Sequence, residues 1–153
     1  MRSKLISIMF ETDATFLAGK VLKRSLPVVS AGGDRGASRV KRLMLPQGEL
    51  AHFYDGEQGM RYIAFIALQA GTIRGNHYHK MKQEFIYLIE GELLLILEDI
   101  ASKCRESLLL RAGDLALISP NIAHALHPRQ TGQAVEYSPE RFDPADIYPY
   151  PLV

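Results

Sequence analysis

Short apolar runs dominate the sequence from residue 61 onward. They read RYIAFIAL, EFIYLIE, ELLLILED, ESLLLRA, LALIS, HALH and AVEY, and glycines at positions 71, 91, 113 and 132 lie between them. Runs of this length separated by turn residues are typical of β-strands, whereas a helix needs a longer periodic segment. We therefore predict an all-β domain, built as an antiparallel barrel or sandwich, with no helix of normal length after residue 60.

Three connections between these runs carry turn signals. Glu90 and Gly91 lie between two apolar runs, and we predict a tight hairpin there because glycine adopts positive φ angles readily. The segment around Gly113 predicts a second hairpin. Residues 80–83 are a connection of hairpin length, after which Glu84 begins the next strand.

The C-terminal tail differs from the runs before it because it is rich in proline, at positions 139, 144, 149 and 151. Proline cannot donate to a sheet ladder, so this tail is not a central strand. Residues 143–146 (DPAD) can cap at most one helical turn. We expect the tail to pack across the outside of the barrel through its aromatic residues Phe142, Tyr148 and Tyr150.

The first 45 residues form a different regime, with mixed apolar runs and a glycine-rich stretch at residues 30–38. We expect residues 1–45 to be an N-terminal extension that packs on the barrel or in a dimer interface, and residues 46–153 to form the barrel. The apolar segment Lys4–Phe10 is a candidate for covering a sheet edge in a homodimer.

Composition narrows the class of partner. The chain has 153 residues, 47% hydrophobic and 23% charged, and its 18 basic and 17 acidic residues leave a net charge of +1. This balance favours a small-molecule partner over nucleic acid or a membrane surface. The single cysteine excludes an intramolecular disulfide, and the longest N-terminal apolar run is too short to span a membrane, so we expect a soluble cytoplasmic protein.

A cluster of polar residues interrupts the strand pattern after residue 76. Alternate side chains of a strand share a face, so His77 and His79 point the same way, opposite to Asn76 and Tyr78. Glu84 follows five residues after His79 and shares a face with the apolar positions of its own run. Two imidazoles in a strand are often only polar surface, but a carboxylate beside them completes a donor set suited to a divalent metal.

The spacing Gly71, His77-x-His79, Glu84, Gly91 resembles the first motif of the cupins. The segment from Gly113 to His124 resembles the second cupin motif, although Asn121 stands where that motif usually has glycine. The resemblance implies a cupin-type jelly-roll barrel that binds one divalent ion, manganese, iron, nickel or zinc. It further implies that two coordination positions stay open and that the ligands are His77, His79, Glu84 and His124.

The two remaining histidines are expected to lie away from the site. His127 follows His124 by three positions, an odd offset that turns it outward in an extended segment. His52 reads as a surface or packing residue. Tyr87 has the opposite parity to Glu84, which places it outside the barrel.

The string RGNHYH, at residues 74–79, resembles cupin epimerases and ketoisomerases of deoxysugar and capsular polysaccharide biosynthesis. This resemblance implies a nucleotide-linked keto sugar as substrate and a histidine or tyrosine that moves the proton, for which His77 and Tyr62 are candidates. Arg74 is a candidate for a diphosphate contact, since guanidinium binds phosphate in a bidentate way. Lys80 and Lys82 either share that role or are solvated loop charges, which we favour for Lys82.

Three functions follow from these residues. The first is a metal-dependent isomerase or epimerase acting on a small carbonyl compound. The second is an iron-dependent dioxygenase that uses the same four ligands. The third is a non-catalytic cupin that binds a ligand or uses its metal to hold strands together.

Overall fold

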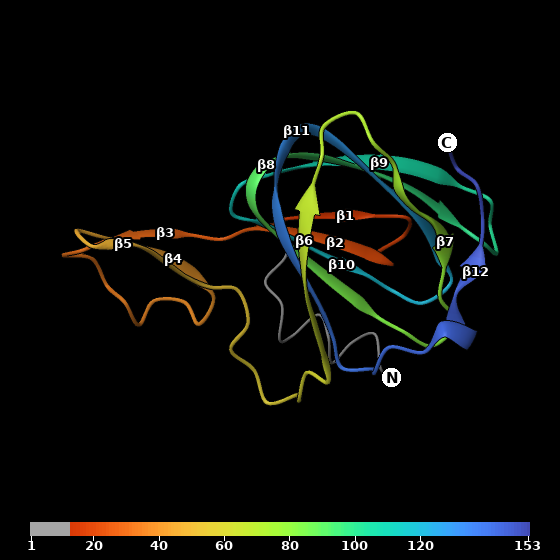
Figure 1. Ribbon diagram of the computed structural model, residues 1–153. Coiled ribbons are helices and arrows are strands. Elements are labelled where there is room, and N and C mark those ends of the chain that lie inside the picture. The colour runs from red at the N-terminus through yellow and green to blue at the C-terminus, as the bar shows by residue number, and fades with distance from the viewer. Residues whose placement is uncertain (1–12) are drawn as a thin grey trace.

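The computed structural model describes residues 13–153 (Figure 1). The segment Lys4–Phe10, predicted to cover a sheet edge, lies outside the described residues. Within residues 13–153 no helix has the length and apolar character needed to cross a membrane.

The described chain is all-β, as predicted, and its one helical element after residue 60 is a single 3-10 turn. The elements are β1 (Ala14–Phe16), β2 (Val21–Ser25), β3 (Val28–Ser30), β4 (Lys41–Leu45), β5 (Gly48–His52), β6 (Tyr62–Leu68), β7 (Arg74–Tyr78), β8 (Glu84–Asp99), β9 (Arg105–Arg111), β10 (Asp114–Ile118), β11 (Ile122–Ser138), η1 (Pro144–Asp146) and β12 (Tyr148–Pro149).

Nine strands form one antiparallel sheet that curves into a barrel, in the order β1-β2-β10-β8-β11-β7-β12, with β6 on β11 and β9 on β8. A small sheet of β3, β4 and β5 projects to one side of this barrel (Figure 1). In it β3 and β4 run parallel, while all other strand pairs are antiparallel.

Residues 1–45, predicted as an extension, include strands of both sheets. β2 pairs with β10, so it forms part of the barrel wall, and β1 adds to its edge. The boundary between residues 45 and 46 falls in the turn that joins the paired strands β4 and β5.

The predicted hairpin at Gly91 is wrong, because β8 continues through this residue as one 16-residue strand. The first half of β8 pairs with β10 and the end of β11, and its second half pairs with β9 and the beginning of β11. The register between β8 and β11 shifts in this region. As a result, the residues of β8 that face the barrel core change from even positions, Ile86 and Leu88, to odd positions, Leu93 and Leu95. Gly91 therefore marks a corner of the barrel, where a strand passes from one wall to the other.

The other two predicted hairpins are also wrong. β9 and β10 flank different halves of β8 and do not pair with each other, so the turn at Gly113 connects two walls. β7 pairs with β11 and β12, and not with β8, so residues 79–83 likewise cross between walls. Each of these turns joins strands that are neighbours in the sequence, but those strands pair with other strands and not with each other.

The barrel interior holds the main hydrophobic core, to which β6, β8, β9, β10 and β11 contribute. A second cluster lies on the outer side of the same wall, where Phe53 stacks on Tyr87 with ring centroids 4.8 Å apart. Tyr87 therefore lies outside the barrel, as predicted. The prediction for the tail is confirmed for Tyr150, which packs with Leu152 on the outer face of β11, and for Tyr148, which stacks on Tyr78, while Asp143 caps the η1 turn. Phe142 is 57% exposed and lies against Tyr62 instead.

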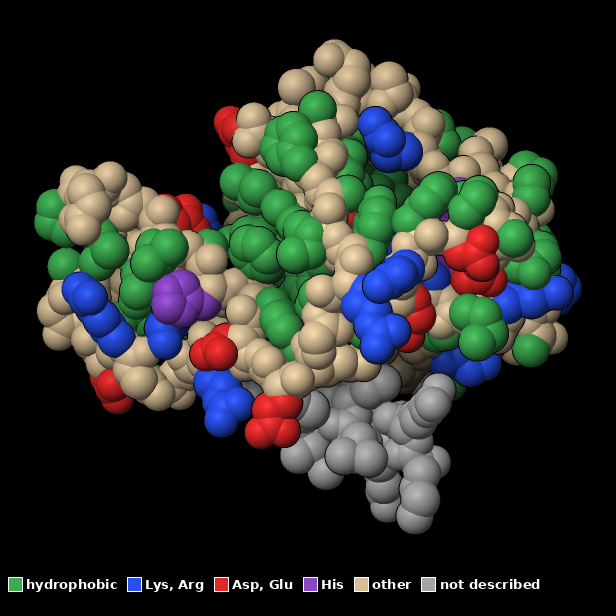
Figure 2. All heavy atoms as spheres, turned by 60° about the horizontal axis from the view of Figure 1, so that its bottom comes forward, with side chains coloured by type: hydrophobic (Ala, Val, Ile, Leu, Met, Phe, Trp, Pro, Cys, Tyr) green, Lys and Arg blue, Asp and Glu red, His purple; other side chains and the backbone are tan. Residues whose placement is uncertain are grey.

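Part of the surface remains apolar. Figure 2 shows hydrophobic side chains gathered between the small sheet and the barrel. On β6, whose one strand partner among residues 13–153 is β11, Ile63 and Phe65 are 70% and 63% exposed. The homodimer stays a prediction, and this open edge is the kind of surface that needs a cover.

The crossing of β8 and β11 generates a prediction for stability. A Cβ atom at Gly132 would lie 1.9 Å from the carbonyl oxygen of Glu90, so the two strands would have to separate. We expect Gly132→Ala to lower the free energy of unfolding by about 3 kcal/mol, measured by urea denaturation. Gly59→Ala is the control, because nothing lies within 4 Å of a Cβ at Gly59. Equal stability of the two variants would contradict this account of the corner.

Candidate metal centre

Four side chains converge at one end of the barrel. His77 comes from β7, His79 follows that strand directly, Glu84 begins β8 and His124 lies near the start of β11. One donor atom from each of these residues lies within 4.8 Å of all the others. His79, Glu84 and His124 are buried, whereas His77 is half-buried and marks the accessible side of the cluster. The structure thus brings together all four residues predicted as ligands.

The backbone around β7 explains how a short strand presents two imidazoles. His77 of β7 pairs with His124 of β11. The register then shifts, so that the next pair is Gly75 with Ala125. Gly75 has a φ of 90°, and a Cβ there would lie 2.7 Å from the carbonyl oxygen of His124, so only glycine fits this irregularity. Asn76 adopts a φ of 55° and points outward, as predicted, where its Oδ1 accepts a hydrogen bond from the Leu152 amide at 2.9 Å.

The Glu84 carboxylate lies between two of the imidazoles. Its Oε1 is 3.1 Å from Nε2 of His79, and its Oε2 is 2.8 Å from Nε2 of His124. The other ring nitrogens face carbonyl oxygens: Nδ1 of His79 is 2.7 Å from Asp146 O, and Nδ1 of His124 is 3.1 Å from Ile122 O. Since a carbonyl oxygen only accepts, each Nδ1 donates a proton there.

With its proton on Nδ1, a neutral His79 ring presents an Nε2 lone pair to the Glu84 carboxylate, whereas the upward pKa shift of His124 favours an Nε2 proton that Glu84 Oε2 accepts. Within residues 13–153, Nε2 of His79 is a buried polar atom with no hydrogen-bond partner. Lone pairs turned toward a carboxylate repel unless a cation lies between them, and a buried polar atom without a partner is costly. The donor set therefore fits a divalent metal, for which neutral imidazole and carboxylate are ordinary ligands.

The electrostatics of the cluster favour a cation beside Glu84. Burial and repulsion by His124 and His79 lower the pKa of His77 to about 4, so its imidazole stays neutral near pH 7. Burial also lowers the pKa of His124, but the charge of Glu84 outweighs it and the net shift is upward. For Glu84, burial raises the pKa, and its contacts with His124 and His79 bring it well below the usual value. Glu84 is thus a buried carboxylate anion.

Lys82 belongs to the site, and the expectation that it is a solvated loop charge is wrong. Its side chain is 6% exposed, and Nζ lies 3.0 Å from Glu84 Oε1 and 2.5 Å from Glu136 Oε1. Two carboxylates inside the barrel mouth draw the ammonium group inward, which compensates their charge. Lys80 does point away from the cluster, with Nζ 4.3 Å from the centroid of the Tyr148 ring.

The two remaining candidates for catalysis occupy different places. The ring of Tyr62, at the start of β6, lies 4.2 Å from Nζ of Lys82 and so borders the mouth of the barrel. Arg74 is exposed at the start of β7, and within residues 13–153 its side chain makes no ion pair. The structure therefore groups Tyr62, but not Arg74, with the charged residues at the mouth.

Sequence reasoning missed two residues at this end of the barrel. Glu136 shares a face of β11 with the buried Ala134, so strand alternation was a usable signal for it. Asp146, in the η1 turn, contacts the loop after β7, and only three-dimensional structure reveals that contact. His127 pairs with Leu94 on the outer side, as predicted, and His52 pairs with Lys41 in the small sheet.

A cavity of about 250 Å³ adjoins the cluster on the side of His79 and Lys82. The C-terminal segment supplies most of its other walls, which are formed by Met81, Glu140, Arg141, Phe142, Asp143 and Asp146. Phe142 is 57% exposed and stacks on Tyr62, with ring centroids 6.2 Å apart. The entrance to this end of the barrel thus combines aromatic faces with charged groups.

Comparison with solved structures identifies similar folds at low sequence identity. The TDP-quinovose 3,4-ketoisomerase of Campylobacter jejuni is 16% identical with a TM-score of 0.64, over 72% of this chain and 88% of that one. The dTDP-4-dehydrorhamnose 3,5-epimerase of Bacillus anthracis is 15% identical with a TM-score of 0.67, over 90% and 81% of the two chains. CapF, solved with the inhibitor 3-isopropenyl-tropolone, is 17% identical with a TM-score of 0.55, over 59% of this chain and 28% of its own.

Sequence comparisons give the family. A search of curated proteins found no match. Residues 64–137, which run from β6 to the end of β11, match the family model described as the cupin domain. Residues 64–137 therefore form a cupin domain, and the fold of the barrel around them is similar to the folds of solved sugar ketoisomerases and epimerases.

Proposed function

We propose that this protein is a metal-dependent cupin enzyme that isomerises or epimerises a small carbonyl substrate, such as a nucleotide-linked keto sugar. The observation that carries the proposal is the convergence of four donor residues within 4.8 Å of one another, among which the buried Nε2 of His79 has no hydrogen-bond partner within residues 13–153. A cation at this point satisfies three donors at once.

One divalent ion, manganese, iron, nickel or zinc, would be held by His77, His79, Glu84 and His124. When bound, such an ion supplies a Lewis acid that polarises a carbonyl group. His77 then serves as a ligand, so it is not free to act as the base. His77 is also the half-buried member of the set, which leaves the open side of the site toward the barrel mouth.

The proton transfer is assigned to the residues around that mouth. Tyr62 is our candidate for the group that exchanges the substrate proton, because it borders the site without being a ligand. Lys82 and the half-buried Glu136 form an ion pair beside it, which places one cation and one carboxylate next to the proposed position of the substrate carbonyl. Together these groups would supply general acid–base catalysis next to the proposed metal ion, which would polarise the carbonyl group.

The similar structures agree with this class of substrate. Two carry the names of a TDP-sugar 3,4-ketoisomerase and a dTDP-sugar 3,5-epimerase. The third binds a tropolone inhibitor, whose carbonyl and adjacent hydroxyl form a bidentate pair. Such an enzyme would work in the cytoplasm as a homodimer, in polysaccharide or deoxysugar biosynthesis.

Metal content is the first prediction of this proposal. We expect the full chain, purified without a histidine tag, to carry one divalent ion, measured by elemental analysis. His79→Ala and His124→Ala should lose that ion, because each removes a buried donor. His127→Ala should retain it, because His127 lies on the outer side of β11. Loss of metal in the His127 variant, or a native chain that cannot be loaded, would contradict the assignment.

Proton exchange is the second prediction. With a nucleotide-linked 4-keto sugar in deuterium oxide, we expect the metal-loaded protein to exchange a substrate proton, measured by nuclear magnetic resonance. Removing the metal or making Glu84→Gln should abolish exchange. Tyr62→Phe should lower the rate by about 100-fold or more while the metal stays bound. Tyr87→Phe, outside the barrel, is the matched control.

The same assay separates the competing functions. Exchange of the substrate proton that persists in metal-free protein would contradict the metal-dependent mechanism. Oxygen consumption with a candidate diol or thiol, without proton exchange, would indicate a dioxygenase. Thermal stabilisation by the sugar nucleotide with neither reaction would indicate a non-catalytic binding protein.

A further inference from the structure

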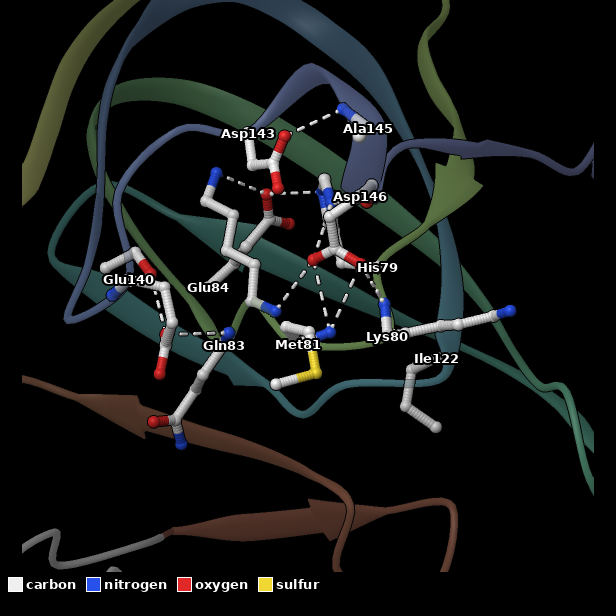
Figure 3. Close-up of polar contacts among 12 residues, drawn as sticks. His79, Lys80, Met81, Gln83, Glu84, Ile122, Glu140, Asp143, Ala145 and Asp146 are labelled. Carbon is white, nitrogen blue, oxygen red and sulfur yellow. Dashed lines mark hydrogen bonds and ion pairs between the residues drawn. The ribbon is translucent and has the colours of Figure 1, made fainter.

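The C-terminal segment contacts the loop that carries His79. In the η1 turn, the Asp146 carboxylate accepts hydrogen bonds from three successive backbone amides (Figure 3). Oδ1 binds the Lys80 amide at 2.8 Å, and Oδ2 binds those of Met81 and Lys82 at 3.1 Å each. An ionised carboxylate makes strong hydrogen bonds to backbone amides, so one side chain fixes most of this loop.

The backbone of Asp146 acts on His79 itself. Its carbonyl oxygen lies 2.7 Å from Nδ1 of His79, and this bond places the ring proton on Nδ1. Nε2 is then left without a proton, 3.1 Å from Glu84 Oε1. The loop and the ring are thus held by two different groups of the same residue.

The segment after Asp146 continues along β7, the strand that carries His77. Tyr148 pairs with Tyr78, and the Tyr150 amide donates to the Asn76 carbonyl at 2.7 Å. Residues 143–153 therefore contact the stretch from Asn76 to Lys82 at both ends. The tail thus adds to the contacts of the β11 region, where His124 pairs with His77 and the Asn121 amide donates to the His79 carbonyl at 2.7 Å.

We propose that Asp146 is a positioning residue of the site, which holds His79 in the Nδ1-protonated tautomer with Nε2 directed at Glu84. The proposal extends the function proposed above, since it assigns to the tail the control of metal affinity. Partners that orient a ligating histidine typically change metal affinity 10- to 100-fold when removed. Asp146 touches neither substrate nor metal in this account, and acts through His79.

The test compares Asp146→Ala with Asp143→Ala in the full chain. Asp143 lies in the same turn, but among residues 13–153 the one amide that its carboxylate accepts is that of Ala145, at 2.9 Å. We therefore expect this variant to disturb the turn and to leave the His79 loop in place. Nitrogen-15 resonance of the metal-free proteins reports the tautomer of His79. Competition with a chelator reports the affinity for zinc, and near-ultraviolet circular dichroism verifies that each variant is folded.

We expect the native protein and Asp143→Ala to keep His79 protonated on Nδ1. Asp146→Ala keeps the backbone carbonyl but removes the carboxylate that holds the His79 loop against it, so this variant should lose the tautomer preference and bind zinc about 10- to 100-fold more weakly. Asp146→Asn, which keeps one acceptor oxygen, should give an intermediate affinity and serves if the alanine variant does not fold. An unchanged tautomer in a folded Asp146 variant would overturn the proposal. Failure of the native protein to bind zinc, with the tautomer shift still present, would refute the metal site and not the role of Asp146.

Discussion

A buried carboxylate sets the arrangement of one end of this barrel. Glu84 is 4% exposed, and an isolated carboxylate at such a position costs several kcal/mol unless its charge is compensated. Compensation comes from the Lys82 ammonium and from the imidazoles of His79 and His124, whose Nε2 atoms lie 3.1 Å and 2.8 Å from its two oxygens. The residues that compensate the charge of Glu84 are therefore also the residues that would hold the metal or border its site.

The barrel delivers these groups through two long strands and one loop. β8 and β11 each run along both walls, and the corner at Gly91 and Gly132 lets them stay paired along most of their length. Glu84 and His124 lie near the starts of these strands, so their positions follow from the register. Within residues 13–153 the loop after β7 pairs with no strand, and the C-terminal tail holds it in place together with the Asn121 amide, which donates to the His79 carbonyl. The paired strands and the fixed loop thus hold the metal-ligand side chains in position before a metal binds.

Local sequence patterns correctly predicted which face of a strand a side chain lies on. They failed where residues far away in the sequence determine strand pairing or side-chain burial. The period of two placed His77, His79 and Glu84 on one face, and it placed Tyr87 on the other. The same local reasoning took Gly91 for a hairpin, because a glycine between apolar runs looks alike in a turn and in a barrel corner. It also left Lys82 in solvent, since the carboxylate of Glu136 that draws it inward lies 54 residues away. Asp146 gave no signal, because its role rests on backbone amides.

The central claim is that a cation bridges Glu84 and the imidazoles around it. Anomalous diffraction at the absorption edge of the co-purified metal, on crystals of the full chain, tests this most directly. The account predicts one strong peak, at ligand distance from Glu84 and from Nε2 of His79 and His124. No peak there, with Glu84 hydrogen-bonded to a protonated imidazole in its place, would contradict it.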